Sequence, residues 1–162
     1  MKKYVTGALV LAWMVIIFAF SAQDATESSQ TSQSVSYRIA ELKNRLLRQE
    51  KTEEELVKQA ESMQFVIRKG AHMSEYALLA ILLILHLECY DFSNRKKILL
   101  ALGLAVCYAA SDEFHQIFVP GRAGRFADVC IDSAGSLAGL LFYLTGNIVL
   151  LRSAKEYRFP MR

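Results

Sequence analysis

The sequence is poor in the residues that build disulfide frameworks and thiolate metal sites. It has three cysteines in 162 residues. The cysteines, Cys89, Cys107 and Cys130, form no C-x-x-C pair, and each lies in or beside an apolar stretch. A disulfide framework or a thiolate zinc site is therefore not expected. We predict instead that the three side chains are buried packing residues.

Motifs that fix a reaction class are missing as well. The chain has no P-loop, no nucleophile elbow and no H-E-x-x-H helix. Its net charge of +3 is small, and no basic patch alternates with aromatic residues, so nucleic acid is not an expected partner. No motif indicates a cofactor, and the sequence leaves a bound metal undetermined.

Apolar residues are abundant, at 53%, and they are concentrated in long stretches. Each stretch has about the twenty residues that a helix needs to cross roughly 30 Å of hydrocarbon. Because backbone amides in lipid must be paired within their own segment, every stretch is expected to be helical. The predicted fold is all-α: a single domain, residues 1–162, forming an integral membrane bundle of four transmembrane helices. Their ranges are about 4–22, 71–89, 97–119 and 129–151.

The first stretch also has features of a signal peptide. Lys2 and Lys3 precede the apolar run, and the small residues Ser21 and Ala22 end it. The run is longer than a usual signal-peptide core, and the residues after it make a poor cleavage site. An uncleaved anchor is the favoured interpretation, and cleavage is the alternative.

The orientation follows from lysine and arginine residues near the span ends, which favour the cytoplasmic side. The relevant residues are Lys2 and Lys3, then Arg95, Lys96 and Lys97, then Arg152, Lys155, Arg158 and Arg162. With four spans, these three groups fall on one side. We therefore predict a multi-pass protein of the cytoplasmic membrane with both termini cytoplasmic and an outer loop over residues 23–70.

The outer loop is expected to contain an extracytoplasmic helical hairpin between the first and second spans. Residues 21–36 are rich in Ser, Thr and Gln and suggest a flexible linker. From Tyr37 onward, apolar residues recur at helical spacing, and Thr52 with Glu55 matches a capping box that begins a second helix. Two alternatives remain: a solvated hairpin resting on the bundle, or an interfacial lid over a site.

Ionisable residues inside the predicted helices gather at one end of the bundle. Such residues are costly in a membrane and normally face the bundle interior or a watery cavity. Because successive helices alternate in direction, the polar ends of the second, third and fourth spans lie on the same side, which is the predicted outer side of the membrane. They carry Arg68, Lys69, His72, Glu75 and Tyr76; then Asp112, Glu113, His115 and Gln116; then Asp128 and Asp132, with Arg122 and Arg125 in the loop above.

This cluster supports several kinds of chemistry. His72, Asp112 and Glu113 are the candidate acid–base groups. The candidate binding residues are Arg68, Lys69, Glu75, Tyr76, Gln116, Arg122, Asp128 and Asp132. Arginines suit a phosphate or carboxylate, and the acids with His72 suit a divalent cation. A self-neutralising polar network that only holds the helix ends together is the structural alternative.

Small residues mark close packing between helices. Gly135 and Gly139 have G-x-x-x-G spacing in the fourth span, and Ala101, Ala105 and Ala109 recur in the third. These positions let helix backbones approach one another in lipid.

At these same residues the chain resembles the VanZ-like family of small bacterial membrane proteins. The resemblance covers essentially the whole chain. It rests on Phe20-Ser21-Ala22-Gln23, Arg68-Lys69-Gly70-Ala71-His72 with Glu75 and Tyr76, Ser111-Asp112-Glu113 with Gln116, Pro120-Gly121-Arg122, and Asp128 with Asp132 and the glycine pair. After Asp132 this family often has asparagine, whereas this chain has Ser133 and Ala134.

The resemblance implies a location and possible partners, and it does not imply a particular reaction. The member that names the family is implicated in resistance to teicoplanin, a glycopeptide antibiotic that binds cell-wall precursors outside the membrane. Membrane lipids, lipid-linked cell-wall precursors and a lipoglycopeptide are the partners it implies. A binding role in the cell envelope and a small enzyme acting on a lipid substrate both remain open.

Overall fold

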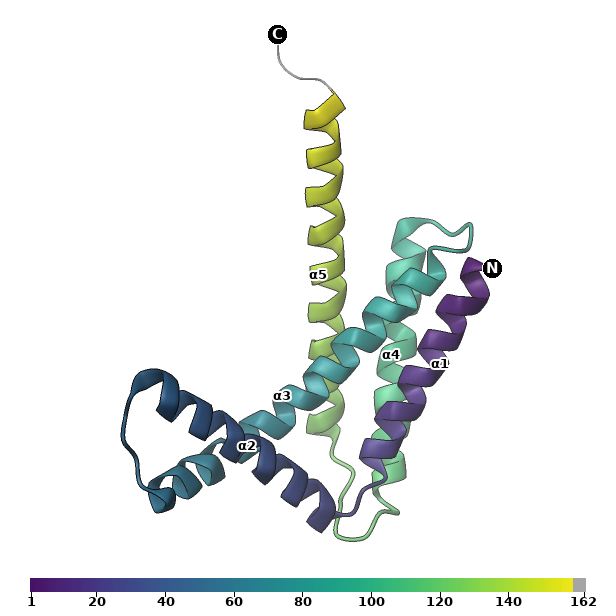
Figure 1. Cartoon of the computed structure of the whole chain (residues 1–162). Helices are drawn as coiled ribbons and strands as arrows, with labels where there is room; N and C mark the ends of the chain where they lie inside the picture. Colours follow the sequence, from purple (N-terminus) through teal and green to yellow (C-terminus); the bar gives the residue numbers. More distant parts are fainter. Residues whose placement is uncertain (159–162) are drawn as a thin grey trace.

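The computed structural model describes the backbone of residues 1–158 and the side chains of residues 1–147. All regular structure in that part is helical, which confirms the predicted all-α bundle. The helices are α1 (Lys2–Ser21), α2 (Ala25–Leu47), α3 (Glu53–Leu87), α4 (Asn94–Gln116) and α5 (Phe126–Arg158) (Figure 1). Four of them, α1, α3, α4 and α5, are long and apolar enough to cross a membrane. The side chains of Arg152, Lys155 and Arg158, and all of Arg162, lie outside the described residues.

The second hairpin helix and the second span are one continuous helix rather than two segments. α3 has 35 residues and begins at the predicted capping box, where the Thr52 amide donates to Glu55 Oε2 at 2.9 Å. Only Gly70 interrupts the helix formers between this start and the predicted span, and a lone glycine does not end a helix. α3 therefore extends from the bundle and carries α2 alongside its first half (Figure 1).

The prediction of a flexible linker over residues 21–36 is wrong, because α2 begins at Ala25. Asp24 caps it by accepting from the amides of Thr26 and Glu27, each at 2.8 Å. Small residues four apart then form a buried face against α3: Ser28, Ser32, Ser36 and Ala40. Ser32 and Ser36 each donate to the carbonyl four residues earlier, which satisfies their hydroxyls inside the interface.

The most extensive contact between two helices of the bundle is that of α3 with α5. A Cβ at Gly135 would lie 2.8 Å from Met73 Cα, and one at Gly139 would lie 2.8 Å from Ala77 Cα. Only glycine permits that approach of two backbones. The small residues of α4, Ala101, Ala105 and Ala109, are fully buried. The predicted role of both small-residue series in helix packing is confirmed.

Side chains tie α1 to its neighbours along its length. Trp13 Nε1 donates to the Glu75 carbonyl at 2.9 Å, and the Tyr108 hydroxyl donates to the Met14 carbonyl at 2.6 Å. Near the N-terminus, the Thr6 hydroxyl lies 3.0 Å from His86 Nδ1. These contacts fix the depth of α1 against α3 and α4.

The prediction that all three cysteines are buried is wrong. Cys107 and Cys130 are exposed on the bundle surface, Cys89 is half-buried, and none is in a disulfide. In a membrane bundle the outward face of a helix is as apolar as the inward face. An apolar neighbourhood in the sequence therefore does not distinguish the two.

Candidate functional site

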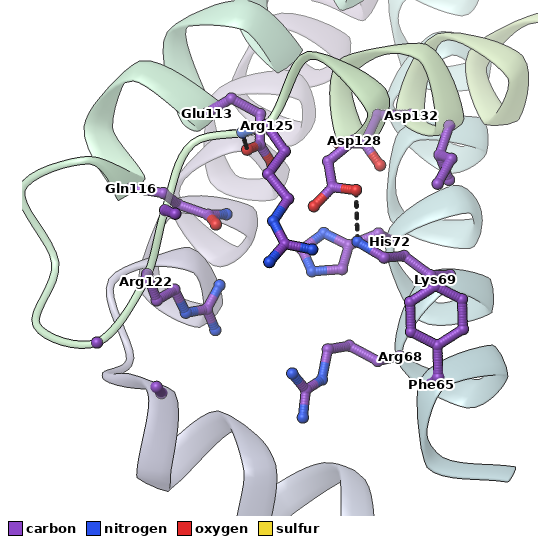
Figure 2. Close-up of a pocket in the computed structure, with 14 residues that line it drawn as sticks. Phe65, Arg68, Lys69, His72, Glu113, Gln116, Arg122, Arg125, Asp128 and Asp132 are labelled. Carbon is purple, nitrogen blue, oxygen red and sulfur yellow. Dashed lines mark hydrogen bonds and ion pairs between the residues drawn. The ribbon is translucent and has the colours of Figure 1, made fainter. Parts of the chain in front are cut away.

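The polar ends of the helices enclose a cavity of about 200 Å³, which we call the polar cavity (Figure 2). It lies where α3, α4, the α4–α5 loop and α5 meet. The predicted site residues that line it are Arg68, Lys69, His72, Glu113, Gln116, Arg122, Asp128 and Asp132; Arg125 also lines it. The structure thus brings most of the predicted residues together around one open space.

One lysine and one acid of this cavity neutralise each other. Lys69 Nζ of α3 lies 2.5 Å from Asp128 Oδ1 of α5, and both side chains are about one-fifth exposed. Figure 2 shows this pair at one side of the cavity. The ion pair joins the two helices, and the charges of Lys69 and Asp128 neutralise each other within the cavity.

The three arginines are different, because none has a carboxylate partner within 4.0 Å in the described part of the chain. We call Arg68, Arg122 and Arg125 the guanidinium cluster. Arg68 donates to the hydroxyls of Ser29 and Ser32 on α2, each at 3.2 Å. Burial lowers the pKa of Arg122, and the charge of Arg68 lowers it further, while the nearby acids Asp112, Glu113 and Asp24 partly oppose this. The three guanidinium groups point into the same open space (Figure 2).

The loop that carries Arg122 and Arg125 is held at several points. The Ala25 amide at the start of α2 donates to the Pro120 carbonyl at 3.3 Å. Glu113 Oε2 accepts from the Arg125 amide at 2.8 Å. Gly121 has a left-handed φ of 71°, which a side chain would strain. The loop therefore presents its arginines from a fixed backbone.

A buried polar layer adjoins the cavity: Gln116 and Asp132 also line the cavity, whereas Tyr76 and Asp112 do not. Tyr76 and Asp112 are almost completely buried. Gln116 donates to Ser21 Oγ at 2.9 Å and lies 3.5 Å from Asp112 Oδ2. The Tyr76 hydroxyl and one carboxylate oxygen of Asp112 and of Asp132 have no hydrogen-bond partner within the described residues. The hydrogen-bonding groups of this layer are therefore only partly satisfied by the described side chains.

The candidate acid–base residues are close in space but not bonded to one another. Among residues 1–147, no hydrogen bond or ion pair joins His72 to Asp112 or to Glu113. The nearest acid to His72 is Glu75, 3.9 Å from Nδ1. His115 packs at a tilt against Phe18 and does not line the cavity. In the same part of the chain, no three His, Cys, Asp or Glu side chains are placed to hold a metal ion.

A family model described as VanZ/LLP1 matches residues 6–151. The chain belongs to the VanZ/LLP1 family. No curated protein and no solved structure matches it. Family membership and the four apolar helices together identify a multi-pass membrane protein.

The VanZ/LLP1 chain has a second cavity that the sequence did not indicate. It measures about 230 Å³, lies between the end of α1, α2 and α3, and has a mostly apolar surface. Phe20, Ser28 and Val35 line it, as does Glu75 from the predicted site. We call it the apolar cavity. It was missed because residues 21–36 suggested a linker; the recurrence of small residues every four positions could have revealed the helix.

Proposed function

We propose that this VanZ/LLP1 protein acts at the outer face of the cytoplasmic membrane by binding the anionic headgroup of an envelope lipid or lipid-linked precursor. The observation that carries the proposal is the guanidinium cluster. Arg68, Arg122 and Arg125 converge on one cavity, and none has a carboxylate partner among the described side chains.

Three cations that share a half-buried cavity repel one another, and an anion placed among them relieves that repulsion. Guanidinium groups bind phosphate and carboxylate through paired N–H donors in a fixed plane. A phosphate has oxygens enough to accept from all three arginines at once. Lys69 is already paired with Asp128, and among the remaining charged residues that line the cavity the three arginines outnumber the two acids, Glu113 and Asp132.

The basic residues at the opposite ends of the helices support the outer-face location. Lys2 and Lys3 begin α1, and Arg95 and Lys96 begin α4, at the end of the bundle away from the cavity. Lysines and arginines in short loops favour the cytoplasm. The cavity then opens at the level of the outer lipid headgroups. There, binding of a headgroup changes how a glycopeptide such as teicoplanin engages its precursor, which is the route to tolerance that we propose.

An enzymatic role on the same lipid is the second candidate, and one observation favours it. His72 lines both cavities, and its Nδ1 is buried without a hydrogen-bond partner in the described structure. A histidine so placed is available to exchange a proton with a bound headgroup.

The test is the teicoplanin and vancomycin susceptibility of a Gram-positive host that expresses the chain at matched membrane abundance. We expect teicoplanin-selective protection by the wild type, loss of protection with Arg122→Gln, and no change with Arg48→Gln at the distant end of α2. Absence of protection by the wild type, or full protection by Arg122→Gln, would overturn the proposed role. Loss of protection by His72→Gln with retained lipid binding would favour the enzyme.

A further inference from the structure

The polar and apolar cavities are neighbours with a common wall. Arg68, His72 and Arg122 line both of them. Each cavity alone is smaller than the roughly 300 Å³ at which ligand pockets usually begin, whereas the two side by side exceed it. One ligand that occupies both would therefore have a pocket of ordinary size, with charge at one end and apolar surface at the other.

The apolar cavity is shaped to receive a chain from the side of the bundle. Phe20 lies in the last turn of α1, Val35 lies on α2, and Ile67 and Ala71 lie on α3. α1 and α2 diverge from their short connection (Figure 1). Phe20 is 48% exposed and Val35 is 44% exposed, so the groove between them opens outward from the bundle.

Arg68 lines both cavities and is hydrogen-bonded to α2. Its guanidinium group donates to Ser29 and Ser32 of α2, and α2 forms one wall of the apolar cavity. Gln64 of α3 also donates to the Ser29 carbonyl at 2.8 Å, which holds α2 at this level. The helix that shapes the groove for a chain thus also orients one of the arginines that face the headgroup.

We propose that the two cavities form one site for a single amphiphile: a phosphate ester at the end of a long hydrocarbon chain. The phosphate lies among the guanidinium cluster, and the first methylene groups of the chain lie between Phe20, Val35 and Ile67. This inference rests on the proposed function and names its ligand class. A free phosphate would use only the polar cavity, and a zwitterionic lipid would place an added cation against the arginines.

The experiment measures binding of defined amphiphiles to the full chain in neutral maltoside micelles, by native mass spectrometry at matched total probe concentration. The probes are dodecyl phosphate, butyl phosphate, inorganic phosphate and dodecyl phosphocholine. We expect dodecyl phosphate to bind best. Val35→Trp narrows the groove and is expected to weaken binding of dodecyl phosphate about tenfold, or about 1.4 kcal/mol, the transfer free energy of roughly two methylene groups.

The matched control is Ile39→Trp, one turn further along α2. Ile39 is branched like Val35 and similarly exposed, at 40%, but it lines neither cavity. It is expected to bind dodecyl phosphate like the wild type, while Val35→Trp keeps the wild-type affinity for inorganic phosphate, which has no chain to enter the groove. Because both changes are on the exposed surface of α2, both variants should fold, which their thermal unfolding checks.

Each outcome separates the two proposals. Equal binding of butyl and dodecyl phosphate, or equal effects of Val35→Trp and Ile39→Trp, would overturn the two-cavity site while leaving headgroup binding intact. Equal binding of dodecyl phosphate and dodecyl phosphocholine would overturn headgroup recognition itself, and with it the proposed function.

Discussion

The contact between the backbones of α3 and α5 can be tested by adding a single methyl group. In Gly135→Ala, the new Cβ would lie 2.8 Å from Met73 Cα and would collide with the Met73 carbonyl oxygen. Neither atom can swing away, because both belong to the backbone of a long helix. α5 must therefore move off α3, or α3 must bend.

The expected loss of stability in Gly135→Ala is the difference between two opposing effects. Overpacking a closely fitted site typically costs about 1–3 kcal/mol, and alanine restores about 1 kcal/mol of helix propensity relative to glycine. Because the obstacle here is backbone, we expect the free energy of unfolding to fall by about 1–2 kcal/mol net. For a chain of this size, each kcal/mol lost from the free energy of unfolding lowers Tm by about 2–4 °C.

The assay is thermal unfolding in neutral detergent, followed by circular dichroism. Gly146→Ala is the control, because Gly146 is on the same helix and an added Cβ there meets nothing within 4 Å. It should be as stable as the wild type or more stable by up to about 1 kcal/mol. If Gly135→Ala unfolds at the same temperature as Gly146→Ala, the close contact of α3 with α5 is refuted.

Three further predictions concern the ion pair, the hairpin and the orientation. Lys69→Gln leaves Asp128 without its partner and should lower the free energy of unfolding by about 1–3 kcal/mol. Adding Asp128→Asn should recover part of this loss in a double-mutant cycle. Strictly additive effects would show that the ion pair is absent. Ser36→Leu should push α2 off α3 and speed proteolysis of the hairpin, whereas Ser34→Leu on the exposed face should not; equal cleavage rates would count against the packed hairpin. After the three native cysteines are replaced, a cysteine at Ser34 should react with an impermeant maleimide added to intact cells and one at Lys96 should not; the reverse pattern would invert the proposed orientation.

The spans could be predicted from sequence because lipid leaves the backbone few choices. Long apolar stretches must be helices there, and alternation of direction then places the polar ends of α3, α4 and α5 together. The capping box at Thr52 located the start of α3. What the sequence did not show is where helices continue, because Gly70 is compatible with either a helix break or an uninterrupted helix.

The site was only partly predictable for a similar reason. The charged residues of the polar cavity were identified because charge within a span is rare. The walls of the apolar cavity were missed because serines such as Ser28 and Ser32 are as typical of a loop as of a small-residue helix face. The ion pairs could not be predicted either. Spacing along one helix does not show which residue of another helix lies opposite, so it could not show that Asp128 is paired with Lys69 and that Asp132 is not.

The most direct test of the central claim asks which lipids remain on the protein when it leaves a bilayer. Native mass spectrometry would compare the wild type, Arg122→Gln and Arg48→Gln released from nanodiscs that hold phosphatidic acid and phosphatidylcholine in equal amounts. The guanidinium cluster predicts retention of phosphatidic acid over phosphatidylcholine by the wild type and by Arg48→Gln, and loss of that preference with Arg122→Gln. Equal retention of the two lipids by the wild type, or an unchanged preference in Arg122→Gln, would contradict it.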